Sequence, residues 1–456
     1  MLDVSIRNGT VVSDGNVRKA DIGIHDGRIV ELGAQGSLDS APDYIDAEGC
    51  YVLPGVVDVH FHCRAPSRPD RGDFSSETRA AAVGGVTTVC EMPISDPACS
   101  TPEVFHARRA LLESAAYVDV ALYAGGAVKS TREAEAMADA GAVGFKLFTH
   151  QPSPERSREF QGLWATTEFD IYTALKAIAP TGLVCTVHAE NDALLSAFGQ
   201  FATLDGVPHR PPLIESTAIA MIGALGADAG ARIHIAHVTS REAVDSLRGA
   251  RASGCDITGE TCPQYLVFDR TFIERFGAFA KVSPPLRDLD DVEYLWRSLE
   301  EGHVNIIASD HAPFLPAEKS EATYASAPSG LPTVETMLPI MVDAALRERI
   351  PLALAVDMLT ARPAARFGLY PKKGTISPGA DADIVIVDPT RSRALSVDQL
   401  TSRAGRCGLV YEGMNLRGLI VRTLLRGHTI VQDGNVREPQ VGRFLKPADA
   451  LSVKVV

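Results

Sequence analysis

Apolar and polar positions follow two different patterns along the chain. Near the amino terminus, the stretches DVSIRNGTVVS, ADIGIHDGRIVELG and DYIDAEGCYVLPG are short apolar or alternating runs that contain Asn-Gly and Asp-Gly pairs. Such pairs favour tight turns between antiparallel strands. The same pattern returns near the carboxyl terminus in GADADIVIVD and GLIVRTLLRGHTIVQDGNV. We therefore expect one small β domain built from residues 1–52 and 371–440, followed by a tail over residues 441–456.

The middle of the chain carries eight apolar segments, and most follow a stretch of helical composition. They begin with GVVDVHFH at 55–62 and continue at 87–93, 118–126, 142–148, 182–191, 231–240, 255–266 and 304–313. Apolar strands that alternate with helices are typical of parallel strands covered by helices. Eight such units within residues 53–370 predict an α/β fold, a (β/α)8 barrel of TIM type, joined to the smaller β-sandwich domain. A doubly wound open sheet is the alternative.

Composition limits the classes of partner. The net charge of −13 argues against nucleic acid and anionic membranes, which both bind basic surfaces. No apolar run approaches the roughly 20 residues that span a bilayer, and the first residues do not resemble a secretory signal. The eight cysteines include no CxxC pair, which favours free thiols in a reducing cytoplasm. We expect a cytoplasmic protein that binds small molecules.

Residues with metal-ligand side chains stand at the ends of several predicted strands. In a barrel of this type, the active site lies at the carboxyl ends of the strands. Each residue taken alone has a structural explanation. Lys146 could extend its amine to the surface, His188 could be an ordinary core histidine, and Asp310 could cap a helix. Their joint occurrence predicts a metal centre instead. The six candidate ligands are His60, His62, Lys146, His188, His237 and Asp310.

The first strand shows how side-chain direction selects candidates. Side chains two residues apart in a strand share a face, so His60 and His62 are expected to point to one site. Phe61 between them is expected to point into the barrel wall. Asp58 shares the histidine face at a deeper position. We expect its carboxylate to accept an N–H from one of the two imidazoles, which would fix the tautomer of that ring.

The same rule sorts the other histidines. His234 and His237 are three residues apart, so they are expected on opposite faces, with only His237 at the barrel mouth. His311 is expected to point away from Asp310. Structural or surface positions are expected for His25, His106, His209, His303 and His428.

The motifs in order resemble those of one family, the cyclic amidohydrolases. This family contains hydantoinases, dihydropyrimidinases, allantoinases and dihydroorotases. The matching stretches cover nearly the whole chain and include PGVVDVHFH, GAVGFKLF, VHAEN, HIAHVTS, ETCPQYL, KVSPPLRD and ASDHAP. A lone HxH motif is weak, but this ordered set at barrel spacing is specific. The resemblance implies a hydrolase that opens the ring of a cyclic amide or ureide.

The resemblance also implies a pair of divalent metal ions, most often Zn²⁺. His60 and His62 match the ligands of one ion, and His188 and His237 match those of the other. Lys146 matches a lysine that reacts with carbon dioxide, giving an N6-carboxylysine whose carbamate bridges both ions. A carbamate supplies the anionic oxygens that an amine lacks. Asp310 matches the catalytic aspartate, which binds the first ion and moves a proton while hydroxide between the ions attacks the ring carbonyl.

Two positions argue against a dihydroorotase. Arg64 matches an arginine that binds the substrate carboxylate in dihydroorotases, although an ion pair with a loop carboxylate is an alternative. Dihydroorotases carry asparagines where this chain has Ile94 and Ser283. We therefore give a dihydroorotase-like activity less weight.

Other positions favour a hydantoinase- or allantoinase-type enzyme, whose substrate would be a five-membered cyclic ureide. Gln151 stands where dihydropyrimidinases and D-hydantoinases have a ring-binding tyrosine, which argues against a standard dihydropyrimidinase. Ser283 fits a serine that these enzymes and some allantoinases use to contact the ring amide. Pro332 lies in a loop that resembles the same branch but lacks a backbone N–H for the ring. The chain looks most like L-hydantoinases and allantoinases. The candidate substrate-binding residues are Arg64, Gln151, Ser283 and Pro332.

Three alternatives stay open at this point. A dihydropyrimidinase-like amidase is one, and a structural relative without catalysis is another, although all six ligand positions are intact. A deaminase with one metal ion is disfavoured because the chain has HAE after its fifth strand instead of HxxE, and a lysine in the fourth strand. The resemblance further implies a homo-oligomer, commonly a tetramer.

Overall fold

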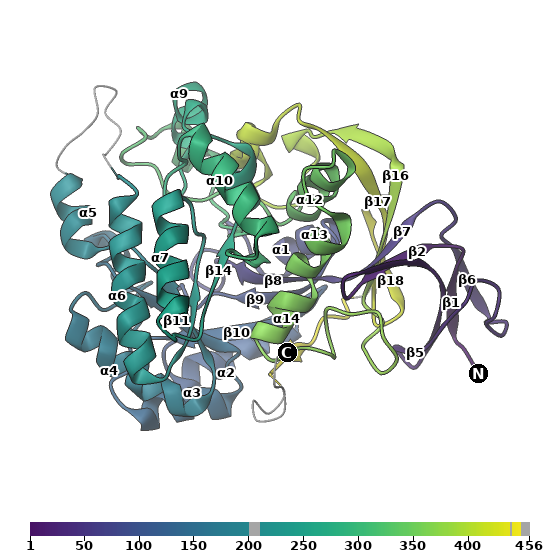
Figure 1. Cartoon of the computed structure of the whole chain (residues 1–456), viewed down its shortest axis with the longest axis horizontal. Helices are drawn as coiled ribbons and strands as arrows, with labels where there is room; N and C mark the ends of the chain where they lie inside the picture. Colours follow the sequence, from purple (N-terminus) through teal and green to yellow (C-terminus); the bar gives the residue numbers. More distant parts are fainter. Residues whose placement is uncertain (200–209, 438–439, 448–456) are drawn as a thin grey trace.

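The computed structural model describes residues 1–199, 210–437 and 440–447, which form a barrel beside a β domain (Figure 1). The eight parallel strands of the barrel sheet lie in chain order. Phe61 also pairs in parallel with His311, and the His62 N–H donates to the His311 carbonyl at 2.9 Å. The first strand therefore meets the segment after the last one, and the sheet is a nearly closed ring. This confirms the barrel and excludes the open sheet.

The barrel strands coincide with the eight apolar segments. They are β8 (Val56–Phe61), β9 (Val86–Glu91), β10 (Asp119–Gly125), β11 (Gly144–Phe148), β12 (Val184–His188), β13 (Arg232–Ile235), β14 (Ile257–Thr261) and β15 (Ile306–Ile307). Alternation within β11 shows how the sequence aims a polar group inward. Phe145 and Leu147 belong to the core cluster that contains helix residues, so Lys146 between them faces the barrel interior.

Helices between the strands cover the outside of the sheet (Figure 1). In α7, Ser240 caps the first turn, and Ala243, Val244, Leu247 and Ala250 form the buried stripe expected of an amphipathic helix. None of the described helices is both long and apolar enough to cross a membrane. The longer helices are α1 (Phe74–Val83), α2 (Pro102–Glu113), α3 (Thr131–Ala140), α4 (Glu168–Ile178), α6 (Leu213–Ala229), α7 (Arg241–Ala252), α10 (Leu289–Glu300), α12 (Met337–Leu346) and α13 (Leu352–Leu359). The shorter ones are α5 (Asp192–Phe198), α8 (Pro263–Val267), α9 (Thr271–Phe276), α11 (Pro316–Ser320) and α14 (Ala361–Arg366).

The β domain consists of two sheets that draw strands from both ends of the chain. The smaller sheet has the order β5 (Arg28–Gly33), β4 (Asp21–His25), β1 (Val4–Arg7) and β6 (Asp43–Asp46). The larger has the order β19 (Asn435–Val436), β18 (His428–Gln432), β17 (Asn415–Leu425), β16 (Ile384–Ala394), β7 (Tyr51–Pro54), β2 (Thr10–Ser13) and β3 (Asn16–Lys19). Antiparallel pairing of β7 with β16 joins the two ends. Ile22 and Ile384 share one core cluster, as in a sandwich.

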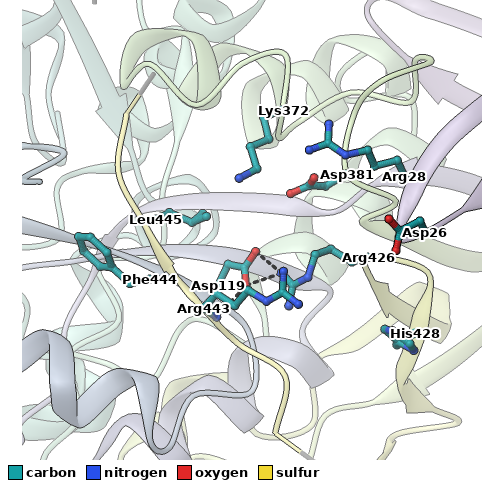
Figure 2. Close-up of a pocket in the computed structure, with 11 residues that line it drawn as sticks. Asp26, Arg28, Asp119, Lys372, Asp381, Arg426, His428, Arg443, Phe444 and Leu445 are labelled. Carbon is teal, nitrogen blue, oxygen red and sulfur yellow. Dashed lines mark hydrogen bonds and ion pairs between the residues drawn. The ribbon is translucent and has the colours of Figure 1, made fainter. Parts of the chain in front are cut away.

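Part of the predicted tail is a strand on the barrel. β20 (Phe444–Leu445) pairs in parallel with the start of β10. Asp119, the first residue of β10, accepts hydrogen bonds from the Arg426 side chain (Figure 2). It also accepts one from the Arg443 N–H. Buried Lys373 lies 2.6 Å from the same carboxylate. These charged groups join the barrel, the β domain and residues 440–447. Asp119, Arg426 and Arg443 also line a cavity of about 330 Å³.

Replacing Phe61 tests the packing of the first strand separately from its chemistry. The ring is fully buried and stacks on His311 with centroids 5.2 Å apart. We expect Phe61→Ala to lower the free energy of unfolding by about 3–5 kcal/mol, measured by denaturant titration, while the folded fraction keeps its metal content. Phe169→Ala, at a side chain that is exposed, is the control and should change stability by less than about 0.5 kcal/mol. Equal effects of the two substitutions would contradict this packing.

Candidate active site

Three of the predicted ligands converge at the carboxyl end of the first strand. His60 is on β8, His62 follows it, and Asp310 lies after β15 with a left-handed φ of 46°. Asp310 Oδ1 is 3.2 Å from His60 Nε2 and 3.3 Å from His62 Nε2. Two ligand atoms that each bind one zinc ion at about 2.0–2.1 Å in a tetrahedral arrangement lie roughly 3.3–3.4 Å apart. The three side chains therefore fit a divalent metal ion.

Two further imidazoles continue the row. His188 ends β12, and His237 follows β13. Their ring centroids are 4.5 Å apart, and the His237 ring is 5.4 Å from that of His60. Buried His237 Nδ1 has no hydrogen-bond partner among the described residues. The two predicted pairs of histidines are thus adjacent, as a centre with two metal ions requires.

Lys146 is a buried amine without a partner. Its side chain is fully buried, and Nζ makes no hydrogen bond to the described residues. Burial lowers the pKa of Lys146 to about 8, although nearby Glu260 and Asp310 oppose the shift. After burial, the charge of Lys146 is among the causes that lower the pKa of His62, His188 and His237. Lys146 therefore lies within electrostatic range of both histidine pairs.

The expected opposition of His234 and His237 is wrong. His234 Nε2 contacts Glu260 Oε2 at 3.0 Å inside the barrel, and Glu260 in turn contacts His60, the neighbour of His237. Strand β13 ends at Ile235, and His237 has a left-handed φ of 37°. Side chains alternate between faces only in extended backbone. Beyond Ile235, a spacing of three residues therefore no longer predicts opposite faces. His234 lies deeper, and His237 lies in the histidine row.

The expected role of Asp58 is also wrong. Its carboxylate accepts the backbone N–H of His60 at 3.2 Å and that of Ser309 at 2.9 Å, so it joins the first strand to the segment before Asp310. The acceptor of the His60 ring is Glu260 on β14, which contacts Nδ1 directly. Burial would raise the pKa of Glu260, but His60 and His234 outweigh it and hold that pKa well below the usual range.

A second carboxylate orients His188. Glu190 Oε2 lies 2.8 Å from His188 Nε2, an arrangement that leaves Nδ1 of this ring free for a metal ion. Burial lowers the pKa of His188 to about 3, which keeps the ring neutral as a ligand must be. Arg210 forms an ion pair with Glu190 and donates to Ser283 Oγ at 3.0 Å. Ser283, a predicted ring contact, is thereby connected to the second histidine pair.

Sequence reasoning missed His150. Its ring centroid is 4.9 Å from that of His188, and His150, His188 and Glu190 form one of the clusters that can hold a cation. Its Nδ1 donates to the Gln151 carbonyl at 3.0 Å. The sequence did offer a signal, because His150 stands only four residues after Lys146, in KLFTHQP, near the end of the fourth strand.

The other histidines fall as expected where the structure describes them. His311 points away from the cluster and bonds Glu77 at 2.8 Å. His25, His106 and His428 are exposed and His303 is partly exposed, whereas His209 lies outside the described residues.

The remaining substrate-binding candidates have different surroundings. Arg64 is buried, donates to the Pro313 carbonyl at 3.2 Å and lies over the Phe314 ring. Among the described residues, no carboxylate forms an ion pair with it. Gln151 is exposed, and its side chain makes no hydrogen bond to described residues. No bond therefore connects it to the histidine cluster. Pro332 is buried beside Leu331, which pairs with His311.

Comparisons with known proteins agree with this geometry. Over 98% of each chain, the sequence is 36% identical to an allantoinase from Rubrobacter xylanophilus. It is 33% identical to an L-hydantoinase from Paenarthrobacter aurescens over 98% of both chains. Among solved structures, an L-hydantoinase from Arthrobacter aurescens superposes with a TM-score of 0.91 at 32% identity, over 98% of this chain and 100% of that one. A dihydropyrimidinase from Brevibacillus agri gives a TM-score of 0.87 at 30% identity, over 98% of both.

The family assignment rests on the same part of the chain as the site. The amidohydrolase family matches residues 51–427, which include all eight barrel strands and the six predicted ligands. The two relatives are more than 30% identical over nearly the full length, so the match establishes the family as well as the fold. The chain belongs to the amidohydrolase family.

Proposed function

We propose that the protein hydrolyses a five-membered cyclic ureide, such as allantoin or a 5-substituted hydantoin. The observation that carries the proposal is the convergence of His60, His62 and Asp310 beside a second histidine pair and an unpartnered buried lysine. Relatives named allantoinase and L-hydantoinase support the same activity. A cyclic amide hydrolase needs an activated water, a polarised carbonyl and a proton donor for the leaving nitrogen, and this site has candidates for each.

The residues would hold two divalent cations, for which zinc suits the imidazole-rich donor set. We assign His60, His62 and Asp310 to one ion and His188 and His237 to the other. When bound, such ions lower the pKa of a water molecule and polarise a carbonyl oxygen.

Lys146 completes the donor set only after modification. The neutral amine attacks the carbon of carbon dioxide, a C–N bond forms, and the electron pair of one C=O bond moves to oxygen. The nitrogen proton leaves to solvent, so the product is a carbamate anion with two oxygens. The burial of Lys146 and its missing hydrogen-bond partner support this assignment, because an unmodified ammonium group there would have no counter-ion in contact.

Asp310 is the proposed proton carrier. Burial raises the pKa of this carboxyl, which brings it closer to the value at which a group both accepts and donates a proton near neutral pH. It would accept the proton of the attacking water and give it to the ring nitrogen as the C–N bond breaks. The left-handed backbone at Asp310 places the carboxylate against both histidines of the first strand.

Arg64 and Ser283 are the residues proposed to choose the ring. The buried Arg64 guanidinium has no carboxylate partner among described residues, and Arg71 and Arg156 add to burial in lowering its pKa. It is therefore suited to an oxygen on the ring substituent. Ser283, held by Arg210, is suited to the ring amide. The exposed Gln151 stands where dihydropyrimidinases and D-hydantoinases carry a tyrosine, which argues against a standard dihydropyrimidinase.

A substrate panel tests the proposal. The purified protein, loaded with zinc in bicarbonate buffer, is assayed with allantoin, 5-substituted hydantoins, dihydrouracil and dihydroorotate. We expect one of the first two classes to be opened with a kcat/KM at least about tenfold above the others, because Arg64 and Ser283 are the proposed contacts for the substituent and the amide of such a ring. Preference for dihydroorotate or dihydrouracil, or no turnover of any ring, would contradict the proposal.

Compartment and assembly belong to the same proposal. The eight cysteines are all free, and seven are buried, which supports a reducing cytoplasm. A homotetramer follows from the resemblance to the family and is tested by light scattering.

A further inference from the structure

A chain of buried polar side chains crosses the barrel interior below the histidine row. Glu260 Oε1 contacts His60 Nδ1, and Glu260 Oε2 lies 3.0 Å from His234 Nε2. His234 Nδ1 lies 2.8 Å from Thr258 Oγ1. Glu260 and His234 are fully buried. The chain therefore runs from β14 through β13 and back to β14 before it reaches β8.

With Glu260 ionised and both imidazoles neutral, the donors and acceptors of this chain fit together in one way. A carboxylate only accepts hydrogen bonds, so His60 Nδ1 and His234 Nε2 must both carry hydrogen. His234 Nδ1 is then an acceptor, and the Thr258 hydroxyl is its donor. His60 Nε2 is left with its lone pair, and this is the atom 3.2 Å from Asp310 Oδ1. The chain thus selects the tautomer of His60 that binds a cation.

Other neighbours of His60 do not supply this selection. Asp58 shares its strand, but its carboxylate accepts the backbone N–H of His60 and the N–H of Ser309. Asp310 faces the opposite ring nitrogen. Among the described residues, Glu260 is the one group that contacts Nδ1. It comes from a strand on the other side of β15, so it fixes the ring from outside its own element.

We propose that Glu260 and His234 are positioning residues, which hold the His60 ring so that Nε2 faces the first metal ion. His234 touches neither a predicted metal ligand nor the substrate-binding candidates by hydrogen bond, and it acts by keeping Glu260 in place. The inference rests on the proposed function, because it assumes that His60 binds a metal ion. It adds two residues that the HxH motif does not contain and that lie in other strands.

Zinc titration of the metal-free protein tests the inference. The parent and each variant are titrated against a chromophoric chelator, which resolves the two binding equivalents. Glu260→Met removes the acceptor at nearly constant volume, and we expect one equivalent to bind about 10–100-fold more weakly while the other stays near the parent value. His234→Phe should weaken the same equivalent by a smaller factor. Thr258→Val removes the hydroxyl at the end of the chain, and we expect it to have the smallest effect on zinc binding. Thr258 borders a cavity of about 890 Å³, so the substitution can be accommodated.

The double variant separates positioning from independent structural roles. If His234 acts through Glu260, the Glu260→Met/His234→Phe protein should bind zinc no more weakly than Glu260→Met alone. If the double variant instead loses zinc affinity by the product of the two single losses, His234 does not act through Glu260 and the inference is overturned. The control is Glu335→Gln, which changes a buried carboxylate that caps the N–H groups of Thr401 and Ser402 and should leave both equivalents unchanged.

A second readout follows the tautomer directly. In nitrogen-15 spectra of the metal-free parent, with His60 assigned by its loss in His60→Asn, we expect Nδ1 protonated and Nε2 unprotonated. Glu260→Met should give a mixture of tautomers. If Glu260→Met does not fold, Glu260→Gln decides. Its carbonyl oxygen replaces only one of the two carboxylate oxygens, and its NH2 group is a donor that faces the other imidazole N–H, so we expect a loss of about threefold or more in one equivalent.

Failure of the inference differs from failure of the proposed function. If the parent binds no zinc, the proposed function fails, and the inference fails with it. If the parent binds two equivalents and the Glu260 variants bind them equally tightly, only the inference is overturned. Equal weakening of both equivalents would also overturn it, because the chain contacts one histidine pair.

Discussion

Replacing Lys146 with alanine is expected to remove most of the bound zinc and to lower kcat/KM by at least about 10³-fold. The side chain lies in the barrel interior within electrostatic range of both histidine pairs, and its carbamate is the proposed bridging anion. Loss of a metal-based contribution of several kcal/mol to the transition state corresponds to a rate loss of this size. Elemental analysis of the desalted variant and initial rates on the best ureide substrate measure the two effects.

The cavity left by this substitution offers a positive control. Acetate or propionate fits the space of the missing side chain and carries the carboxylate that the carbamate would supply, so millimolar amounts should restore part of the zinc and the activity. Lys319→Met removes another buried lysine, whose Nζ donates to the carbonyls of Ala278 and Lys281, and should keep two metal ions. Full activity of Lys146→Ala without added acid would refute the role of Lys146.

Single alanine substitutions of His60 or His62 are expected to abolish binding of one zinc ion and nearly all turnover. Both Nε2 atoms face Asp310 Oδ1, so each substitution removes a neutral donor and leaves the carboxylate with one imidazole. We expect kcat/KM to fall by at least about 10³-fold. Isothermal titration should show one remaining equivalent near the parent affinity, because His188 and His237 are untouched.

His106→Ala provides the matched control, since its exposed ring lies on α2 away from the barrel mouth. It should bind two equivalents and keep the parent rate. If the His60 and His62 variants also bind two equivalents as tightly as the parent, the HxH motif is a structural pair and not a metal site.

The barrel could be predicted because its strands are predominantly apolar segments separated by stretches of helical composition. The weakest case is β15, where the segment 304–313 contains only two paired strand residues. The backbone there leaves the extended conformation so that Asp310 can turn toward the histidines. The division of the chain near residues 52 and 371 stays a prediction, which the pairing of β7 with β16 supports.

The ligand types could be read from the sequence, but the residues that orient them could not. Glu260 appears in ITGET as an ordinary polar residue, and only the closed barrel brings it to His60, which is 200 positions away. Asp58 was the local choice of acceptor, and it was wrong because its carboxylate is used by backbone N–H groups. His237 shows a third limit, since its left-handed backbone ends the alternation on which the prediction relied.

Anomalous diffraction from crystals of the zinc-loaded protein, grown with bicarbonate, tests the central claim most directly. The account predicts two zinc peaks at the barrel mouth. One should lie about 2.0–2.1 Å from His60 Nε2 and His62 Nε2, and the other at a similar distance from nitrogens of His188 and His237, with density for a carbamate on Lys146 between them. A single peak, peaks away from these histidines, or an unmodified Lys146 amine between two bound ions would contradict it.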